Sequence, residues 1–344
     1  MTSLDIGIFA HDEAGQIGQL IADLGRQEIF AGEEPDLRVL ILANGCTDAT
    51  VPEARAAIAA LPPAIAARFE VIDLPQGGKS RTGHRFIHEF SRPDADILGF
   101  MDADIRLPRT DTLRLMAEAM AARPELRVFT SRPVKDVVHH KLKTGLAGRL
   151  IAAGGEGLTD WRKSIAGSLF FLRTPTARRI GLPAGLPVED GFFRAMVLTD
   201  LLSGPEDLSR IDGDPEVFHI YESLRTVGEL LHHQTRLVIG SAVNAALYGR
   251  IRREAPTEAR AHALLMRAAA DEGWLARTLS EELPRRPHGY VPAAFLVNRW
   301  RHWRSHGRRS PKALAMLAAG MAMDAVVWLR ASYKMLRGTA AGHW

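Results

Sequence analysis

Residues 97–104 read ILGFMDAD, a short apolar run that ends in two aspartates separated by one alanine. A short apolar run bounded by polar residues is typical of a strand covered on both faces of a sheet. In extended backbone, residues i and i+2 point to one side, so Asp102 and Asp104 can address one cation while Ala103 points away. Two carboxylates suit a hard divalent ion such as Mg²⁺ or Mn²⁺. We therefore predict a buried strand that ends at a metal site; the alternative is a pair of turn-forming acids.

Three similar apolar runs precede this segment and are separated by stretches with helical periodicity. The runs are 5–9, 37–42 and 69–73, and the helical stretches include 15–26 and 50–60. Thr50 and Glu53 are spaced as a capping box at the start of the second helix. This alternation predicts βαβ units and an α/β fold class, a Rossmann-like, mostly parallel sheet flanked by helices.

Composition and charge narrow the class of protein. The chain has 344 residues, of which 46% are hydrophobic and 24% charged, and this mixture excludes a disordered chain. Its single cysteine, Cys46, excludes a disulfide scaffold and suits a reducing compartment. Residues 1–13 lack the pattern of a secretory signal, so we expect a cytoplasmic protein.

The carboxy-terminal residues are strongly basic. Residues 285–344 hold eleven Lys or Arg and one acid, Asp324, so they carry +10, whereas the first 284 residues carry −6. Arginines alternate with Trp300 and Trp303, and an apolar run of eleven residues, 313–323, follows. That run is shorter than the roughly 20 residues needed to cross a bilayer, so we expect an interfacial anchor on an anionic membrane surface and not a spanning helix. Nucleic acid is the less favoured partner, and a helix packed on the catalytic domain or at a dimer interface is the alternative.

A glycine-rich segment follows the third apolar run. In an open α/β sheet, ligands bind outside the carboxyl ends of the strands, which is where Gly77, Gly78 and Lys79 fall. A Walker A loop would require glycine at position 73, which is Asp73, so we exclude that motif. Lys79 can still reach a phosphate; the alternative is a turn before a solvated helix start.

The order of these segments resembles the family-2 glycosyltransferases, which have the GT-A nucleotide-diphospho-sugar transferase fold. The resemblance covers roughly residues 4–240. The segments that carry it are IFAHDE (8–13), LANGCTDAT (42–50), GK (78–79), DAD (102–104), GSLFFLR (167–173) and VED (188–190).

The resemblance implies an inverting transfer in which an acceptor hydroxyl attacks the sugar's anomeric carbon as a nucleoside diphosphate leaves. It makes Asp190 the general base, whereas the alternative is that Glu189 and Asp190 only decorate a helix start. It places Ala10 and Glu13 along the nucleotide. Asn44 stands where the family commonly uses Asp to read the base, so a UDP-sugar is favoured only weakly.

A histidine-rich segment, HHQTR at 232–236, resembles a basic segment that lies over the diphosphate in relatives. The resemblance makes Arg236 a catalytic residue that stabilises the leaving diphosphate, since guanidinium binds phosphate in a bidentate way. Leu237 replaces the tryptophan of the processive synthases, which argues for a non-processive enzyme. His219 is a candidate third metal ligand beside Asp104; the alternative is a packed core histidine.

These observations together predict the organisation and function of the chain. We expect a GT-A domain at 1–240, with a nucleotide-sugar half (1–130) and an acceptor half (131–240), and a helical, basic extension at 241–344. The expected activity is metal-dependent sugar transfer to a hydroxyl of a lipid-linked or membrane-associated acceptor, on the inner face of a membrane. The alternatives are a catalytically silent GT-A core that binds membrane or nucleic acid, and a GT-A nucleotidyltransferase, for which residues 10–13 lack the Gly-rich, basic signature.

Overall fold

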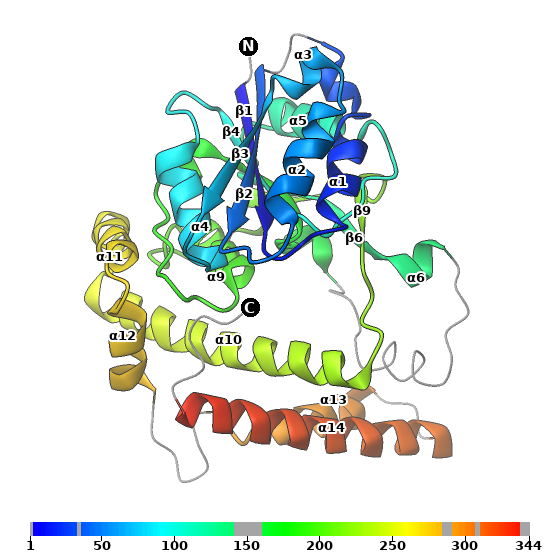
Figure 1. Ribbon diagram of the computed structural model, residues 1–344. Helices are drawn as coiled ribbons and strands as arrows, with labels where there is room; N and C mark the ends of the chain where they lie inside the picture. Colours follow the sequence, from blue (N-terminus) through cyan, green and yellow to red (C-terminus); the bar gives the residue numbers. More distant parts are fainter. Residues whose placement is uncertain (1–2, 33–35, 141–159, 284–290, 307–309, 338–344) are drawn as a thin grey trace.

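The computed structural model describes residues 3–32, 36–140, 160–283, 291–306 and 310–337 (Figure 1). The Gly-rich segment 145–157, where we expected acceptor-specific structure, lies outside the described residues.

A seven-stranded sheet of order β3-β2-β1-β4-β7-β5-β8 forms the centre of the molecule, and β6 and β9 form a second, two-stranded sheet. The strands are β1 (Ser3–Ala10), β2 (Asp36–Asn44), β3 (Phe69–Leu74), β4 (Ile97–Asp102), β5 (Val128–Thr130), β6 (Arg132–Lys135), β7 (Leu169–Arg173), β8 (Ile211–Asp212) and β9 (Phe218–Tyr221). Strands β1 to β4 pair in parallel, as the sequence predicts, whereas β7 runs antiparallel to β4 and β5. The four apolar runs are therefore the parallel part of a mixed sheet.

The sheet separates two hydrophobic cores. Along β1, Leu4, Ile6 and Ile8 belong to the core under α1, α2 and α5, whereas Phe9 belongs to the core under α4, α9 and α10. The helices of the α/β part are α1 (Ile17–Leu24), α2 (Thr50–Ala59), α3 (Pro63–Ala66), α4 (Lys79–Arg85), α5 (Thr112–Ala122), α6 (Asp136–His139), α8 (Thr174–Ala177) and α9 (Glu189–Leu198). Short 3-10 or π segments, η1 to η4, lie at Glu28–Phe30, Phe86–Phe90, Trp161–Lys163 and Leu208–Arg210. Burial on both faces explains why these strands read as continuous apolar runs.

The start of α2 differs from the expected capping box. The N-cap is Ala49, and Thr50 is the first helical residue. The Thr50 hydroxyl instead accepts a hydrogen bond from the backbone N–H of Glu13 (2.7 Å), and the Glu53 carboxylate accepts one from Gly15 (2.5 Å). Both side chains therefore brace the loop after β1, because that loop's N–H groups have no strand partner.

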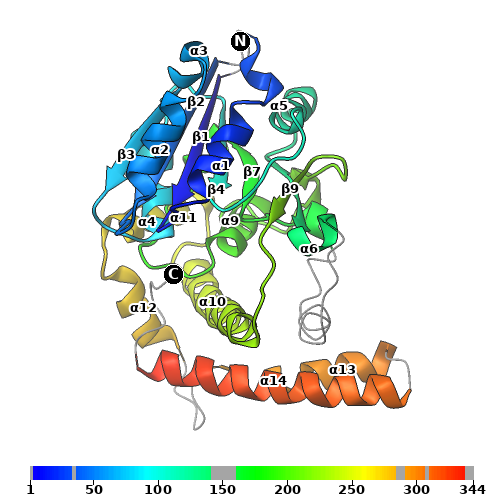
Figure 2. The ribbon, with the colours of Figure 1, turned by 45° about the vertical axis from the view of Figure 1, so that its right-hand side comes forward.

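The carboxy-terminal helices are α10 (Val227–Glu254), α11 (Glu258–Ala270), α12 (Trp274–Glu282), α13 (Phe295–His306) and α14 (Pro311–Leu336). The boundary that we expected after residue 240 lies inside α10, which is continuous across it. Residues of α10, α11 and α12, together with Ala331 and Met335 of α14, share one hydrophobic core with the sheet, and α13 and α14 form the outer layer beyond α10 (Figures 1 and 2). Among the described residues, the carboxy-terminal helices after residue 240 are thus partly packed into the same hydrophobic core as the sheet.

Helix α14 is longer than the apolar run in the sequence. It passes through Asp324, which is 8% exposed and accepts hydrogen bonds from Arg299 of α13 at 2.8 and 3.1 Å. This pairing neutralises the acid, so the helix continues from Pro311 to Leu336. Ala313–Leu336 is long and apolar enough, by length and composition, to cross a membrane, with a mean hydropathy of 1.5. The length argument against a spanning helix was therefore wrong, because it ended the apolar segment at Asp324. In the structure Asp324 is paired with Arg299, and α14 continues beyond it.

Candidate active site

The carboxyl ends of β1, β2 and β4 and the starts of α4 and α9 meet at one edge of the sheet (Figure 1). Gly45, which follows β2, has a φ of 63°, and a Cβ there would lie 2.7 Å from the backbone nitrogen of Gly77. Only glycine permits this approach of the β2 loop to the glycine turn before Lys79. The sequence thus brings three of its predicted segments to one edge.

Lys79, at the first residue of α4, is the centre of the site. Its ammonium group contacts Asp102 Oδ1 at 2.5 Å and Glu189 Oε1 at 3.2 Å. Burial opposes the charge of Lys79, but Asp102 and Glu189 outweigh it and raise the Lys79 pKa above its ordinary value. Lys79 therefore connects the predicted metal motif to the acidic pair at the start of α9.

Asp102 is the last residue of β4 and Asp104 lies in the turn after it, so the extended backbone that we expected to carry both side chains ends at Asp102. Ala103 is 2% exposed, whereas Asp102 and Asp104 on either side of it are both partly exposed. Burial, with repulsion from Asp104, raises the pKa of Asp102 to about 6 despite the opposing charge of Lys79. Burial and repulsion from Asp104, Asp102, Asp48 and Asp12 raise the pKa of Glu13 to about 7. Their carboxylate oxygens are the ligand type that a hard divalent cation prefers, and a nearby cation would relieve this repulsion.

Asp190 lies at the first turn of α9 and lines a small, mostly apolar cleft together with Lys79 and Glu189. The rings of Phe9, Phe100 and Phe170 are stacked along this cleft. Burial and the neighbouring Glu189 raise the pKa of Asp190, against the opposing effects of the Gly191 N–H, Lys79 and Arg236. The Gly191 N–H donates to Asp190 Oδ1 at 2.7 Å. A buried carboxylate with a raised pKa is a competent general base near neutral pH.

Three residues of α10 hold the start of α9 in place. A Cβ on Gly240 would lie 2.0 Å from Val188 Cγ2, so the two helices are in close contact there. Asn244 Nδ2 donates to the Val188 carbonyl (3.2 Å), and the Tyr248 hydroxyl donates to the Gly191 carbonyl (3.0 Å). The sequence analysis missed these positioning residues; their only signal is the spacing of four, which puts them on one helix face.

Arg236 lies on the same helix, where its charge lowers the pKa of Asp190. Its side chain is partly exposed, and within the described part of the chain it makes no hydrogen bond or ion pair. An arginine of this kind beside a cleft remains available to an anionic ligand.

In the structure, His219 is a packed core histidine. It is fully buried, and its Nε2 and Nδ1 lie 2.7 Å from the Ser168 hydroxyl and 3.0 Å from the Ser131 hydroxyl. Burial lowers its pKa to about 3. With both ring nitrogens bonded to hydroxyls, His219 has no nitrogen facing a metal, which corrects its candidate role as a ligand.

Two predicted nucleotide contacts are also buried. Ala10 is fully buried, and its carbonyl accepts a weak hydrogen bond from the Cys46 thiol (3.4 Å). Asn44 is fully buried and its Oδ1 accepts from the Thr82 hydroxyl (2.8 Å), while its Nδ2 has no partner in the described structure. Asn44 therefore braces α4 and keeps one unused donor.

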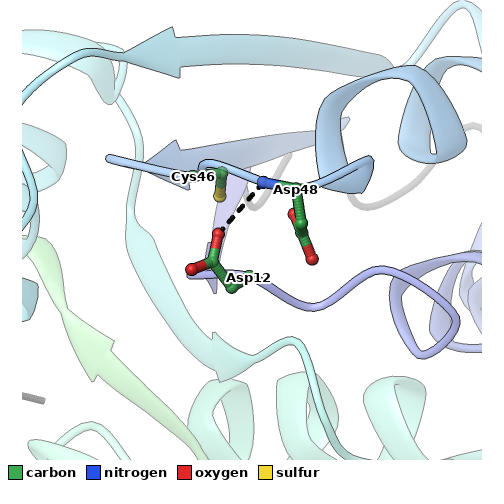
Figure 3. A group of neighbouring side chains, drawn as sticks. All are labelled: Asp12, Cys46 and Asp48. Carbon is green, nitrogen blue, oxygen red and sulfur yellow. Dashed lines mark hydrogen bonds between the residues drawn. The ribbon is translucent and has the colours of Figure 1, made fainter.

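A further group of potential metal ligands comprises Asp12, Cys46 and Asp48, whose ligand atoms lie within 4.8 Å of one another (Figure 3). Asp12 Oδ1 accepts from the backbone N–H of Thr47 (2.6 Å) and of Asp48 (3.3 Å). Asp48 accepts from the N–H groups of Thr50 (2.9 Å) and Ala14 (3.0 Å). Backbone donors thus already satisfy these carboxylates, and their evident role is to join the loops after β1 and β2.

Comparisons with known proteins found a matching family model and similar solved structures. Residues 5–173 match the family model "Glycosyl transferase family 2". No curated protein matches the chain. Among solved structures, the mannosyltransferase PcManGT from Pyrobaculum calidifontis, in complex with GDP-Man and Mn2+, has 16% identity and a TM-score of 0.52, with 98% of this chain and 86% of that chain covered.

Two other solved structures are also similar. S. aureus TarS 1–349, in complex with UDP-GlcNAc, has 12% identity and a TM-score of 0.48, with 98% and 92% of the two chains covered. Glucosyl-3-phosphoglycerate synthase from Mycobacterium tuberculosis, in complex with Mn2+, UDP-Glc and phosphoglyceric acid, has 17% identity and a TM-score of 0.47, with 72% and 80% covered. The family match and the fold shared with the mannosyltransferase agree with the resemblance seen in the sequence. Residues 5–173 therefore form a family 2 glycosyl transferase domain, and the chain has the GT-A fold.

Proposed function

We propose that this enzyme is an inverting, divalent-metal-dependent and non-processive glycosyltransferase that moves a sugar from a nucleoside-diphosphate donor to an acceptor hydroxyl. The observation that carries the proposal is the contact of Lys79 with both Asp102, at the end of β4, and Glu189, the neighbour of the candidate base in α9. A metal-diphosphate site and a general base are the two parts that such a transfer requires.

Asp104 and Asp102 would hold the metal ion, and Glu13 lies close enough for their charges to raise its pKa. The mannosyltransferase of the same fold was solved with Mn2+, which supports Mn²⁺ or Mg²⁺ as the ion. When bound, the ion would offset the negative charge of the donor diphosphate. Lys79 and Arg236 would contribute further positive charge on that side of the cleft.

Asp190 would accept the proton of the acceptor hydroxyl. Its Oδ1 is engaged by the Gly191 N–H, which leaves Oδ2 for the proton. The hydroxyl oxygen forms the new bond to the anomeric carbon, and the bond to the diphosphate breaks with its electron pair going to the leaving group. A single displacement of this kind inverts the anomeric configuration, and Arg236 would stabilise the diphosphate as it leaves.

The base of the donor stays open between uridine and guanosine. The notable departure is Asn44, whose unused buried Nδ2 is a hydrogen-bond donor that an aspartate at this position would lack. We keep a UDP-sugar as the first donor to test, and a GDP-sugar as the second because the mannosyltransferase was solved with GDP-Man.

The proposed acceptor is lipid-linked, and the proposed location is the inner face of a membrane. Support comes from α10, which contacts α9 beside Asp190 and also packs against the apolar helix α14. One helix thus connects the candidate base to the part of the molecule with membrane character.

A thermal-shift panel tests the donor and metal assignments. Nucleoside diphosphates and nucleotide sugars are each added with Mn²⁺ or with EDTA, because a ligand that binds only the native state raises its unfolding temperature. We expect a Mn²⁺-dependent rise with one nucleotide family, lost in Asp104→Ala and kept in Asp94→Ala, an exposed acid that precedes β4 at the opposite edge. If no ligand shifts the wild-type protein, the catalytically silent core becomes the better interpretation.

A turnover assay tests the base. With the donor and acceptor identified, Asp190→Asn should lower kcat by about 10³-fold, because the amide cannot accept the proton. Its Mn²⁺-dependent thermal shift with the donor should be unchanged. Turnover close to that of the wild type would remove Asp190 from this role.

A further inference from the structure

Helix α14 has one packed face and one exposed face. Leu317, Val327, Ala331 and Met335 are buried, and α14 packs on α10 and α13. The opposite face is exposed along the whole helix, and every residue of this stripe is apolar. The stripe comprises Ala315, Ala318, Ala322, Val326, Leu329, Tyr333 and Leu336.

The exposure of the larger stripe residues is high for a soluble surface. Leu329 is 60% exposed, Leu336 is 62% and Tyr333 is 53%. The spacing of three or four residues keeps these side chains on one line over about six turns of helix. Figure 2 shows α14 and α13 as the outermost layer of the molecule, on the far side of α10 from the sheet. A continuous apolar stripe of this length marks an interaction surface.

The polar groups around the stripe are basic. Arg301, Arg304, Arg330 and Arg337 are exposed on α13, on α14 and directly after α14. Within the described residues 291–306 and 310–337, the single acid is Asp324, which is buried and bonded to Arg299. The hairpin formed by α13 and α14 therefore presents no exposed negative charge among its described residues.

Two tryptophans lie on α13. The rings of Trp300 and Trp303 are 5.3 Å apart, and Trp300 is 43% exposed. Tryptophan is enriched where an apolar phase meets water, because its ring is large and its N–H is polar. Aromatic, basic and apolar side chains are thus combined on one hairpin, as in helices that lie in a membrane interface.

We propose that the α13–α14 hairpin docks flat on an anionic lipid bilayer, with the stripe of α14 at the acyl boundary and the arginines among the headgroups. Charge complementarity selects this occupant. A second copy of this chain would bring one basic hairpin against another, whereas anionic headgroups attract each arginine by about 1 kcal/mol.

The contacts on the packed face of α14 favour a helix that lies on the bilayer over one that crosses it. A spanning α14 would have to leave α10 and expose Leu317, Val327 and Ala331 while taking the Arg299–Asp324 pair into the hydrocarbon. A flat orientation keeps those contacts and buries only the side that is already exposed. It also holds α10, and through it the start of α9, at a defined position above the lipid surface.

Vesicle flotation tests the proposal without donor, metal or acceptor, so its outcome is independent of the glycosyl-transfer proposal. The full chain is mixed with vesicles of phosphatidylcholine alone or of equimolar phosphatidylglycerol and phosphatidylcholine. The stripe variant is Leu329→Ser with Leu336→Ser. Its matched control is Val138→Ser with Leu208→Ser, two exposed apolar residues outside the hairpin (65% and 45% exposed). A charge variant combines Arg301→Gln with Arg304→Gln.

We expect the wild type and the matched control to float with the anionic vesicles and to be released by high salt. The stripe variant and the charge variant should each partition about tenfold less, since each loses on the order of 1.4 kcal/mol of binding free energy. Equal partitioning of the stripe variant and its control would overturn the proposal. So would wild-type protein that resists alkaline carbonate extraction, as a spanning helix does, or a wild-type dimer that the stripe variant converts to monomer.

Discussion

Two groups of carboxylates lie at the same edge of the sheet and have opposite electrostatics. Asp12 and Asp48 join the loops after β1 and β2 (Figure 3). Hydrogen bonds from Thr50 lower the pKa of Asp48. In the second group, burial and mutual repulsion raise the pKa of Glu13 to about 7 and that of Asp102 to about 6. Hydrogen bonds from the protein stabilise the Asp48 anion in the first group, whereas in the second group burial and repulsion outweigh the one cation, Lys79.

This difference shows that short distances between ligand atoms do not identify a metal site by themselves. The atoms of Asp12, Cys46 and Asp48 lie within 4.8 Å of one another, yet backbone N–H groups already stabilise both carboxylates as anions. Burial and repulsion disfavour the charged forms of Glu13 and Asp102, and a cation would relieve this. Unrelieved charge is therefore the better guide to function at this edge.

The largest expected effect is on turnover, and it separates the two groups. Asp104→Asn should lower kcat/KM by about 10³-fold, because it removes a carboxylate that would hold the metal. Asp12→Asn keeps an oxygen that can accept from the Thr47 N–H, so it should change kcat/KM by less than about threefold. Steady-state kinetics with saturating Mn²⁺ measures both. A comparable loss in the two variants would place the metal at Asp12 and Asp48.

A smaller effect on turnover is expected when Lys79, the cation that contacts both Asp102 and Glu189 of α9, is replaced. Lys79→Met should lower kcat/KM by about 10²-fold, since Asp102 and Glu189 lose their shared counter-ion and the diphosphate side of the cleft loses a positive charge. The variant should also unfold at a lower temperature. Adding Glu189→Gln should recover part of that unfolding temperature but none of the turnover. Full recovery of turnover would reduce Lys79 to a structural role.

A still smaller effect is expected where α10 positions the base. Tyr248→Phe removes the hydrogen bond to the Gly191 carbonyl and should lower kcat about tenfold with little change in KM, because the base is displaced and not removed. Tyr333→Phe, an exposed tyrosine of α14, is the matched control. Loss of folded protein would also lower the apparent kcat without changing KM, so the folded fraction of the variant is measured alongside by circular dichroism. A loss of kcat no larger than the unfolded fraction would contradict the positioning role of Tyr248.

The sequence predicted the strands and the edge at which the site lies, because burial on both faces gives a continuous apolar pattern and parallel strands place their carboxyl ends together. It also placed Asp102, Asp104 and Lys79 at that edge, whereas their roles and that of Asp190 stay predictions. It did not predict Tyr248 and Asn244, whose roles depend on the packing of α10 against α9 more than fifty residues away. His219 was assigned to the metal for a similar reason: its serine partners come from distant elements.

The smallest expected effect is on stability, and its sign differs between the two groups. The pKa of Glu13 rises from 4.5 to about 7, so its contribution to stability is complete below pH 4.5 and is lost as the pH rises through 7. At pH 8 in EDTA, Glu13→Gln removes the repulsion and should raise Tm by about 2–4 °C, a gain that disappears at pH 5. The pKa of Asp48 is lowered from 3.8, so its contribution is present above pH 3.8 and is lost on acidification. Asp48→Asn should therefore lower Tm at pH 8 by about 2 °C. Scanning calorimetry at the two pH values measures both signs, and a lower Tm for Glu13→Gln at pH 8 would show that its carboxylate supports the loop just as Asp48 does.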